Sequence, residues 1–254
     1  MRTFWQYRYL LWNLIVKDLK TRYKTAVFGF LWTFLNPLFF GIVLSFVFYH
    51  IFGGGDSHYV AYILTGIFPW NFFAQSWNQA TVSITGNSYL IQKVSFPREI
   101  LPLSVIGAYG FNFIISLVVL FILLLVFRTN ISWGFLLLPA VIFCQAVLLV
   151  GLGFLTSALE VLYRDTKYLV EMAILFLFYL TPIIYEFKIL PESVLTVARF
   201  NPMSGLIMLY RFCWGLGGAV DWMWVLLSLA EIFAVLVLGV WVFRKLKNNF
   251  ADYV

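Results

Sequence analysis

The chain has 254 residues, of which 63% are apolar and only 11% are charged, and its mean hydropathy is +0.92. Soluble domains contain about 45 to 50% apolar and about 25% charged residues, so this composition excludes a water-exposed surface over most of the protein and indicates an integral membrane protein. The formal charge is +6, and two cysteines and two histidines are too few to indicate a disulfide framework, a metal site or a haem site.

Residues 1–24 mix Trp, Tyr, Arg, Lys and Asp, unlike a cleavable signal peptide, which has a short basic head and an uninterrupted apolar run. On a helical wheel, one narrow arc is polar and most of the remaining circumference is apolar. The polar residues are Gln6, Asn13, Lys17, Lys20 and Lys24. The pattern predicts an N-terminal amphipathic helix in the membrane interface. The alternative, a charged flank of the first span, does not explain an apolar face that begins well before that span.

Six membrane-spanning helices are predicted, since each needs about 20 predominantly apolar residues. The first four lie within the uncharged intervals Lys24 to Asp56, Asp56 to Lys93, Glu99 to Arg128, and Arg128 to Glu160. The fifth covers about 168–185 and the sixth about 222–243. The stretch between them, 186–221, is interrupted by charges and prolines, so we expect short re-entrant helices that enter the outer leaflet without crossing it.

Basic residues are distributed unequally between the loops on the two sides of the membrane, as the six predicted spans define them. Thirteen of the 17 lie on the side of both termini, and four lie on the opposite side. By the positive-inside rule, both termini are predicted to be cytoplasmic. The net charge therefore follows from topology, and a nucleic-acid partner is not needed to explain it. We find no internal repeat or linker, so the prediction is a single all-α membrane domain over residues 1–254.

Motifs of ATP-hydrolysing or membrane-embedded enzymes are absent from the sequence. There is no G-x-x-x-x-G-K-[ST], no H-E-x-x-H and no G-x-S-x-G. Glu231 is the one ionisable residue deep within a predicted span, and it is either a structural hydrogen-bonding group or a proton site. We predict no catalytic residue, metal site or cofactor in this chain.

Aromatic residues recur on the first predicted span at spacings of three, four and seven, which places them on one helix face. This stripe comprises Phe28, Trp32, Phe39, Phe46 and Tyr49. Aromatic rings pack on the C–H surfaces of sugars, so the stripe is a candidate channel lining, and contact with lipid or other helices is the alternative. The second span carries uncharged polar residues between Asn71 and Thr85, which we expect to face protein or water.

Compact motifs in the cytoplasmic loops and near the span ends carry a family resemblance. They are DLKTRYK at 18–24, FPREILPLS at 96–104, Arg164-Asp165 with Lys167, TPI at 181–183, Asn201-Pro202 continuing to Tyr210-Arg211, and FRKLKNNFADYV at 243–254. With these motifs in this order, the chain resembles the permease subunit of type-2 ABC exporters for polysaccharides and polyol phosphates. Thr181 is a departure, since serine is common before that proline.

The resemblance implies a homodimer bound to two copies of a separate ATPase, which would hold ATP and Mg. The complex would export a lipid-linked polysaccharide, foremost lipopolysaccharide O-antigen, across the bacterial inner membrane. Two alternatives are a type-2 permease for a lipid or hydrophobic drug, and a membrane enzyme that acts on lipid-linked sugars.

The resemblance also assigns roles to residues of this sequence. The expected ATPase-coupling residues are Ser88, Tyr89, Leu90, Lys93, Phe96, Pro97, Arg98 and Glu99. A cytoplasmic loop with Arg164 and Asp165 lies between the fourth and fifth spans. The periplasmic gate would include Pro191, Asn201, Pro202 and Arg211, and the aromatic channel lining would extend to Phe176, Tyr179 and Tyr185.

Overall fold

The computed structural model describes residues 7–23, 57–126, 133–185, 191–218, 220–247 and 250–253, and the single positions 31, 32, 35, 38, 39, 42, 43, 46 and 47. Most of the first predicted span, including Phe28 and Tyr49, lies outside the described residues. Every regular element within them is a helix, which confirms the predicted all-α class.

The longest helices are α4 (Ser57–Thr81), α6 (Ile100–Val126), α7 (Leu138–Leu162) and α11 (Trp222–Leu246). Shorter ones are α2 (Arg8–Tyr23), η2 (Thr85–Asn87), α5 (Ser88–Lys93), η3 (Trp133–Leu137), α8 (Thr166–Leu180), α9 (Glu192–Arg199), α10 (Pro202–Cys213) and α12 (Phe250–Tyr253). Three helical stretches are long and apolar enough to cross a membrane, namely α6, the continuous η3 and α7, and α11. They coincide with the predicted third, fourth and sixth spans.

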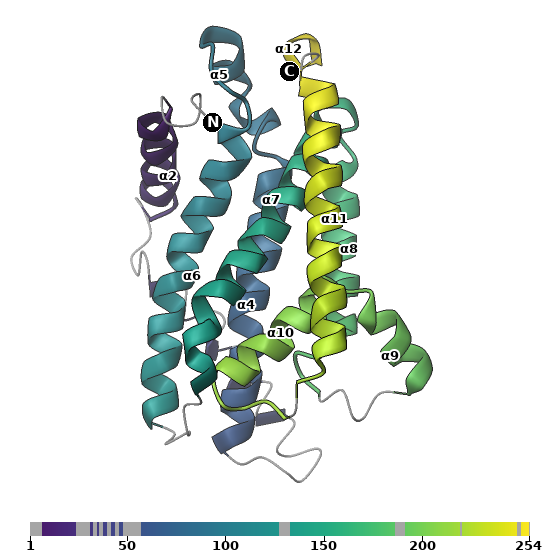
Figure 1. Cartoon of the computed structure of the whole chain (residues 1–254). Coiled ribbons are helices and arrows are strands. Elements are labelled where there is room, and N and C mark those ends of the chain that lie inside the picture. Colours follow the sequence, from purple (N-terminus) through teal and green to yellow (C-terminus); the bar gives the residue numbers. More distant parts are fainter. Residues whose placement is uncertain are drawn as a thin grey trace.

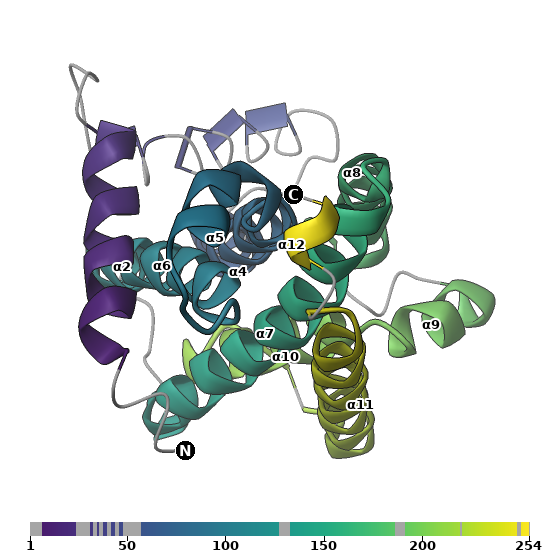
Figure 2. The ribbon, with the colours of Figure 1, turned by 90° about the horizontal axis from the view of Figure 1, so that it is seen from above.

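The long helices run side by side, and α2, α5 and α12 lie at the same end of the bundle (Figure 1). α2 lies across the direction of these helices, and its full length is visible when the bundle is viewed from above (Figure 2). Its Leu14 is buried, and its Ile15 packs against Gly107 of α6 so closely that a Cβ on Gly107 would lie 2.8 Å from Ile15 Cδ1. The opposite face of α2 exposes Trp12 and Lys20, as an interfacial helix would.

The helix of the predicted fifth span ends earlier than expected. α8 stops at Leu180, because Pro182 has no N–H and disfavours the helical conformation at Thr181, whose φ and ψ are −83° and 132°. Its 15 residues extend over about 22 Å, less than the roughly 30 Å hydrocarbon core. Within residues 191–218 the chain forms α9 and α10 at the end opposite α12 (Figure 1), as short as predicted, and their re-entry into the membrane stays a prediction.

The main core lies between α4, α6, α7, α10 and α11, where Phe68, Phe73 and Tyr210 are almost fully buried. A buried polar chain crosses it, since the Tyr210 hydroxyl donates to Gln145 Oε1 at 2.7 Å and Gln145 Nε2 donates to the Pro69 carbonyl at 2.8 Å. The polar run along the end of α4 and the turn after it is divided, because Ser76, Thr81 and Ser83 are buried, as expected, whereas Gln75 and Gln79 are exposed.

A second apolar cluster joins the helix ends beside α2, α5 and α12. It contains Leu14, Ile84, Ile91, Ile100, Leu101, Phe154, Ala158, Val161, Phe243 and Phe250. These side chains come from six helices and the chain between α4 and α5. Residues 88–99, the expected coupling segment, therefore rest on a packed platform.

Candidate functional site

The expected coupling segment forms the short helix α5 followed by an extended loop, at the same end of the bundle as α12 (Figure 1). Val94, the residue after α5, is extended, with φ −129° and ψ 131°. Pro97 disfavours a helical conformation at Phe96, so the chain stays open until the turn that begins α6. Ile91 is buried in the cluster beneath and anchors the segment.

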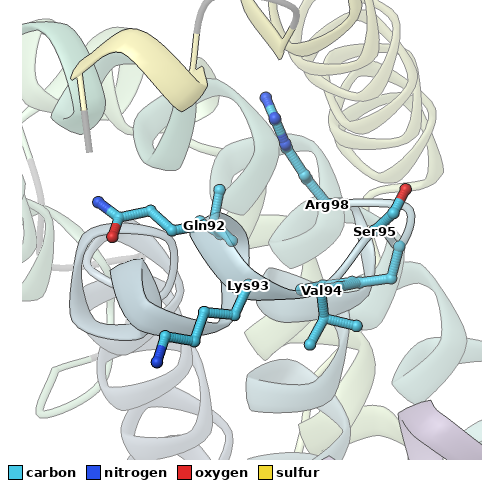
Figure 3. Close-up of a pocket in the computed structure, with 7 residues that line it drawn as sticks. Gln92, Lys93, Val94, Ser95 and Arg98 are labelled. Carbon is cyan, nitrogen blue, oxygen red and sulfur yellow. The ribbon is translucent and has the colours of Figure 1, made fainter.

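The outward surface of this segment combines aromatic, basic and apolar groups. Tyr89 is 64% exposed and Val94 is 52% exposed, and Lys93 Nζ donates to the Tyr89 hydroxyl at 3.0 Å. The chain here bends around a hollow of about 340 Å³, lined by Ile91, Gln92, Lys93, Val94, Ser95, Phe96 and Arg98 (Figure 3). An exposed surface of this kind is suited to contact with another protein.

Arg98 and Glu99, also predicted as coupling residues, are half-buried and contact the C-terminal tail. Arg98 extends away from Lys93, to the other side of the loop (Figure 3), and its Nη1 donates to the Lys247 carbonyl. Lys247 Nζ donates to Glu99 Oε1 at 3.0 Å. Our residue assignment did not include Lys247 or the buried Phe250, although the tail was part of the recognised motif. The opposite charges of Glu99 and Lys247, each beside the end of a predicted span, were the only indication of this pair in the sequence.

The second block, predicted to be cytoplasmic, lies between α7 and α8. Arg164 and Asp165 are exposed, and the turn around them is held by the Lys167 backbone N–H, which donates to Glu160 Oε2 at 2.9 Å. Glu160 itself is 2% exposed. The buried acid therefore fixes the turn, and the two predicted residues project from it.

The aromatic residues predicted to line a channel are exposed wherever the structure describes them, except Tyr185. Trp32, Phe39 and Phe46 are 44%, 56% and 63% exposed, and on α8 Phe176 and Tyr179 are 64% and 68% exposed. Tyr185 is half-buried, and its hydroxyl donates to the Tyr179 carbonyl at 2.6 Å. Both a channel lining and a lipid-facing surface require this exposure.

The predicted gate residues lie at the end of the bundle opposite α5 and α12, and they occupy different environments there. Pro191 is exposed before α9. Asn201 is buried and caps α10, accepting from the Met203 N–H at 3.1 Å, with Pro202 in the first turn, where its missing N–H costs nothing. Arg211 is only 3% exposed, so it lies inside the wall of the bundle instead of on its surface.

Arg211 belongs to a set of contacts that we call the carbonyl clamp. Three successive carbonyls after α8 each accept one side-chain donor. Ile183 accepts from Arg211 Nη2 at 2.8 Å, Ile184 from the Tyr59 hydroxyl at 2.9 Å, and Tyr185 from the Tyr62 hydroxyl at 3.2 Å. The Arg211 Cζ also lies 3.4 Å from the centre of the Tyr62 ring.

The clamp has a direct physical cause in the helix break. Pro182 ends α8, and carbonyls beyond a helix end are costly in an apolar environment unless they find donors. Two tyrosines of α4 and one arginine of α10 supply these donors. Sequence reasoning did not identify Tyr59 and Tyr62, because nothing in their spacing relates them to a segment more than 120 residues later.

Glu231 lies on α11, half-buried, and neither carboxylate oxygen has a hydrogen-bond partner among the described residues. Within the same part of the chain, no group of three His, Cys, Asp or Glu side chains is arranged to hold a metal ion.

Comparison with known proteins supports the expected family. A family model described as ABC-2 type transporter matches residues 9–213. The chain is 32% identical over 250 residues to the O-antigen export system permease protein RfbA of Klebsiella pneumoniae, with 95% of each chain covered. It is 30% identical over 213 residues to the protein of the same name from Myxococcus xanthus, covering 83% of this chain and 82% of that one.

These matches confirm the resemblance carried by the motifs and the prediction of a transport subunit rather than an enzyme. The family and the apolar helices together make this a multi-pass membrane protein. The chain belongs to the ABC-2 type transporter family, as a permease subunit.

Proposed function

We propose that this chain is the transmembrane subunit of an ATP-driven exporter that moves a lipid-linked polysaccharide, foremost O-antigen, across the cytoplasmic membrane. The observation that carries the proposal is similarity to O-antigen export permeases over 95% of both chains. In this proposal two copies form the channel, and two copies of a separate ATPase bind ATP and Mg.

The proposed topology has six spans, with both termini in the cytoplasm. The first span lies within residues 24–56, and α4, α6, α7 and α11 provide four others. The fifth span covers about 168–185, of which α8 forms the helical part up to Leu180 and the chain after it the rest. α2 would then lie in the cytoplasmic interface, and α9 and α10 would re-enter the membrane from the periplasmic side. The unequal distribution of basic residues and the position of α2 across the bundle support this orientation.

The decisive experiment removes this gene from its native host and measures the polysaccharide at the cell surface. Loss of surface O-antigen, with lipid-linked polysaccharide retained inside the cell and restored export after complementation, is the expected result. Unchanged surface polysaccharide together with altered lipid or drug efflux would instead assign the chain to another substrate. A purified chain without an ATPase partner would contradict the proposal altogether.

The exposed face of the coupling segment supports a specific prediction about ATPase binding. Val94→Asp is expected to weaken the permease–ATPase complex roughly tenfold or more, because a buried interfacial charge without a partner costs more than about 1.4 kcal/mol. The measurement is co-purification at graded ATPase concentration. Gly218→Asp is the control, since Gly218 is exposed between α10 and α11, away from α5, and no described heavy atom lies within 4 Å of the position of its Cβ. Equal ATPase binding by both variants would show that Val94 does not lie in the interface.

The channel assignment predicts aqueous access to the aromatic face of α8. In Phe176→Cys, a membrane-impermeant thiol reagent is expected to label the new cysteine in the ATP-bound complex. Leu175→Cys is the control, because Leu175 is 61% exposed on the adjacent side of α8 and is not part of the aromatic set. Protection of the introduced cysteine in both variants would indicate that this face contacts lipid.

A further inference from the structure

The coupling segment is joined to the last long helix by two adjacent residues. Arg98 donates to the backbone carbonyl of Lys247, and Glu99 accepts from the Lys247 side chain at 3.0 Å. Lys247 directly follows α11, and Arg98 and Glu99 directly precede α6. One residue at the end of α11 is therefore held at both its backbone and its side chain.

An aromatic contact reinforces this junction. Phe250 is fully buried, and the Arg98 Cζ lies 5.7 Å from the centre of its ring. The Phe250 ring meets Phe243 of α11 edge to face at 5.4 Å, and Phe243 packs on Phe154 of α7 at 4.9 Å. Burial of Phe250 fixes the tail on the platform beneath the coupling segment.

The ion pair is shielded enough for its loss to be measurable. The side chains of Lys247 and Glu99 are 39% and 19% exposed, so water screens their attraction only in part. The backbone contact of Arg98 keeps the Lys247 main chain in place, and the carboxylate then orients the ammonium group.

We propose that Lys247 and Phe250 form a latch that ties the coupling segment to α11. The latch positions the segment, so that movement imposed by the ATPase reaches α11 directly as well as α6. α6 is continuous with the segment, whereas α11 otherwise packs mainly on α7 and α10, with a smaller contact to α9. The inference rests on the proposed exporter function.

A charge exchange tests the latch in the full permease–ATPase complex. The variants are Glu99→Lys, Lys247→Glu and the two combined. In the permease–ATPase complexes that each single variant forms, surface polysaccharide per ATP hydrolysed is expected to fall about fivefold, and the double variant is expected to return within about twofold of the original protein. Lys245→Glu is the matched control, because Lys245 is exposed and has the same charge two residues earlier.

The possible outcomes separate the latch from the exporter function. Unchanged export per ATP in both single variants would overturn the latch. Reduced export per ATP in both single variants, without recovery in the double variant, would also overturn it. Absence of ATPase from the unmodified complex would instead overturn the exporter function. Should a single variant fail to insert, Phe250→Leu provides the second test, with the same fivefold loss expected and unchanged coupling counting against the latch.

Discussion

Replacing Arg211 by leucine is expected to destabilise the folded chain by about 2–4 kcal/mol. The lost contact with the Tyr62 ring contributes about 2 kcal/mol, and the Ile183 carbonyl left without this donor contributes about 1–3 kcal/mol. Removal of the guanidinium recovers part of its desolvation cost, which accounts for a net effect below the sum. Thermal unfolding of the purified chain in mild detergent should show a midpoint lower by roughly 5–10 °C.

Arg199→Leu is the control for this effect. Arg199 is exposed on α9 at the same end of the bundle, so its removal changes net charge equally. Its Cζ lies 5.7 Å from the centre of the Trp224 ring, and loss of this exposed contact should shift stability by no more than about 1 kcal/mol. Arg211→Gln retains a donor for the carbonyl and should fall between the two. Equal midpoints for Arg211→Leu and Arg199→Leu would show that the carbonyl clamp adds nothing to stability.

Replacing Gly239 by leucine is expected to destabilise the folded chain by about 3 kcal/mol or more, because the added side chain forces α7 and α11 apart. A Cβ on Gly239 would lie 2.8 Å from the carbonyl carbon of Gly151 and 3.0 Å from its Cα. Because both obstructing atoms belong to the backbone, no side-chain rotation relieves the overlap. The expected result is loss of monodisperse protein after detergent extraction, measured by size-exclusion chromatography.

Gly218→Leu distinguishes the steric effect from the loss of a glycine. Gly218 is exposed, and no described heavy atom lies within 4 Å of the position its Cβ would take. This variant should elute like the original protein. If Gly239→Leu also elutes normally with an unchanged unfolding midpoint, the close approach of α7 and α11 at Gly151 is wrong.

Hydrophobic length was sufficient to predict α6, α7 and α11, since a long uncharged run has few alternatives to a buried helix. The same criterion overestimated the length of the fifth helix, because the apolar residues continue past Pro182 whereas the helix ends at Leu180. Pro182 was visible in the sequence, and its backbone effect overrides hydropathy locally. The low charge of 24–56 predicts a first span that lies largely outside the described residues.

The motifs predicted candidate functional regions but not the direction of each side chain. Residues 88–99 were predicted as one coupling unit, yet Tyr89 and Val94 face outward while Arg98 and Glu99 face the tail. Arg211 was assigned to a gate, and the fold buries it in the carbonyl clamp. Adjacent residues on a short helix or loop point in different directions, and a one-dimensional motif does not specify which direction meets a neighbour.

The sequence by itself determined the membrane environment, the all-helical class and the transporter family, because composition and motif order do not depend on long-range contacts. Only the tertiary structure brought Lys247 to Glu99 and Tyr59 to Ile184, across 148 and 125 residues. Such pairs form where helix ends meet in space. A carbonyl or charge without a local partner binds the donor that tertiary packing brings next to it, and the sequence does not specify that donor.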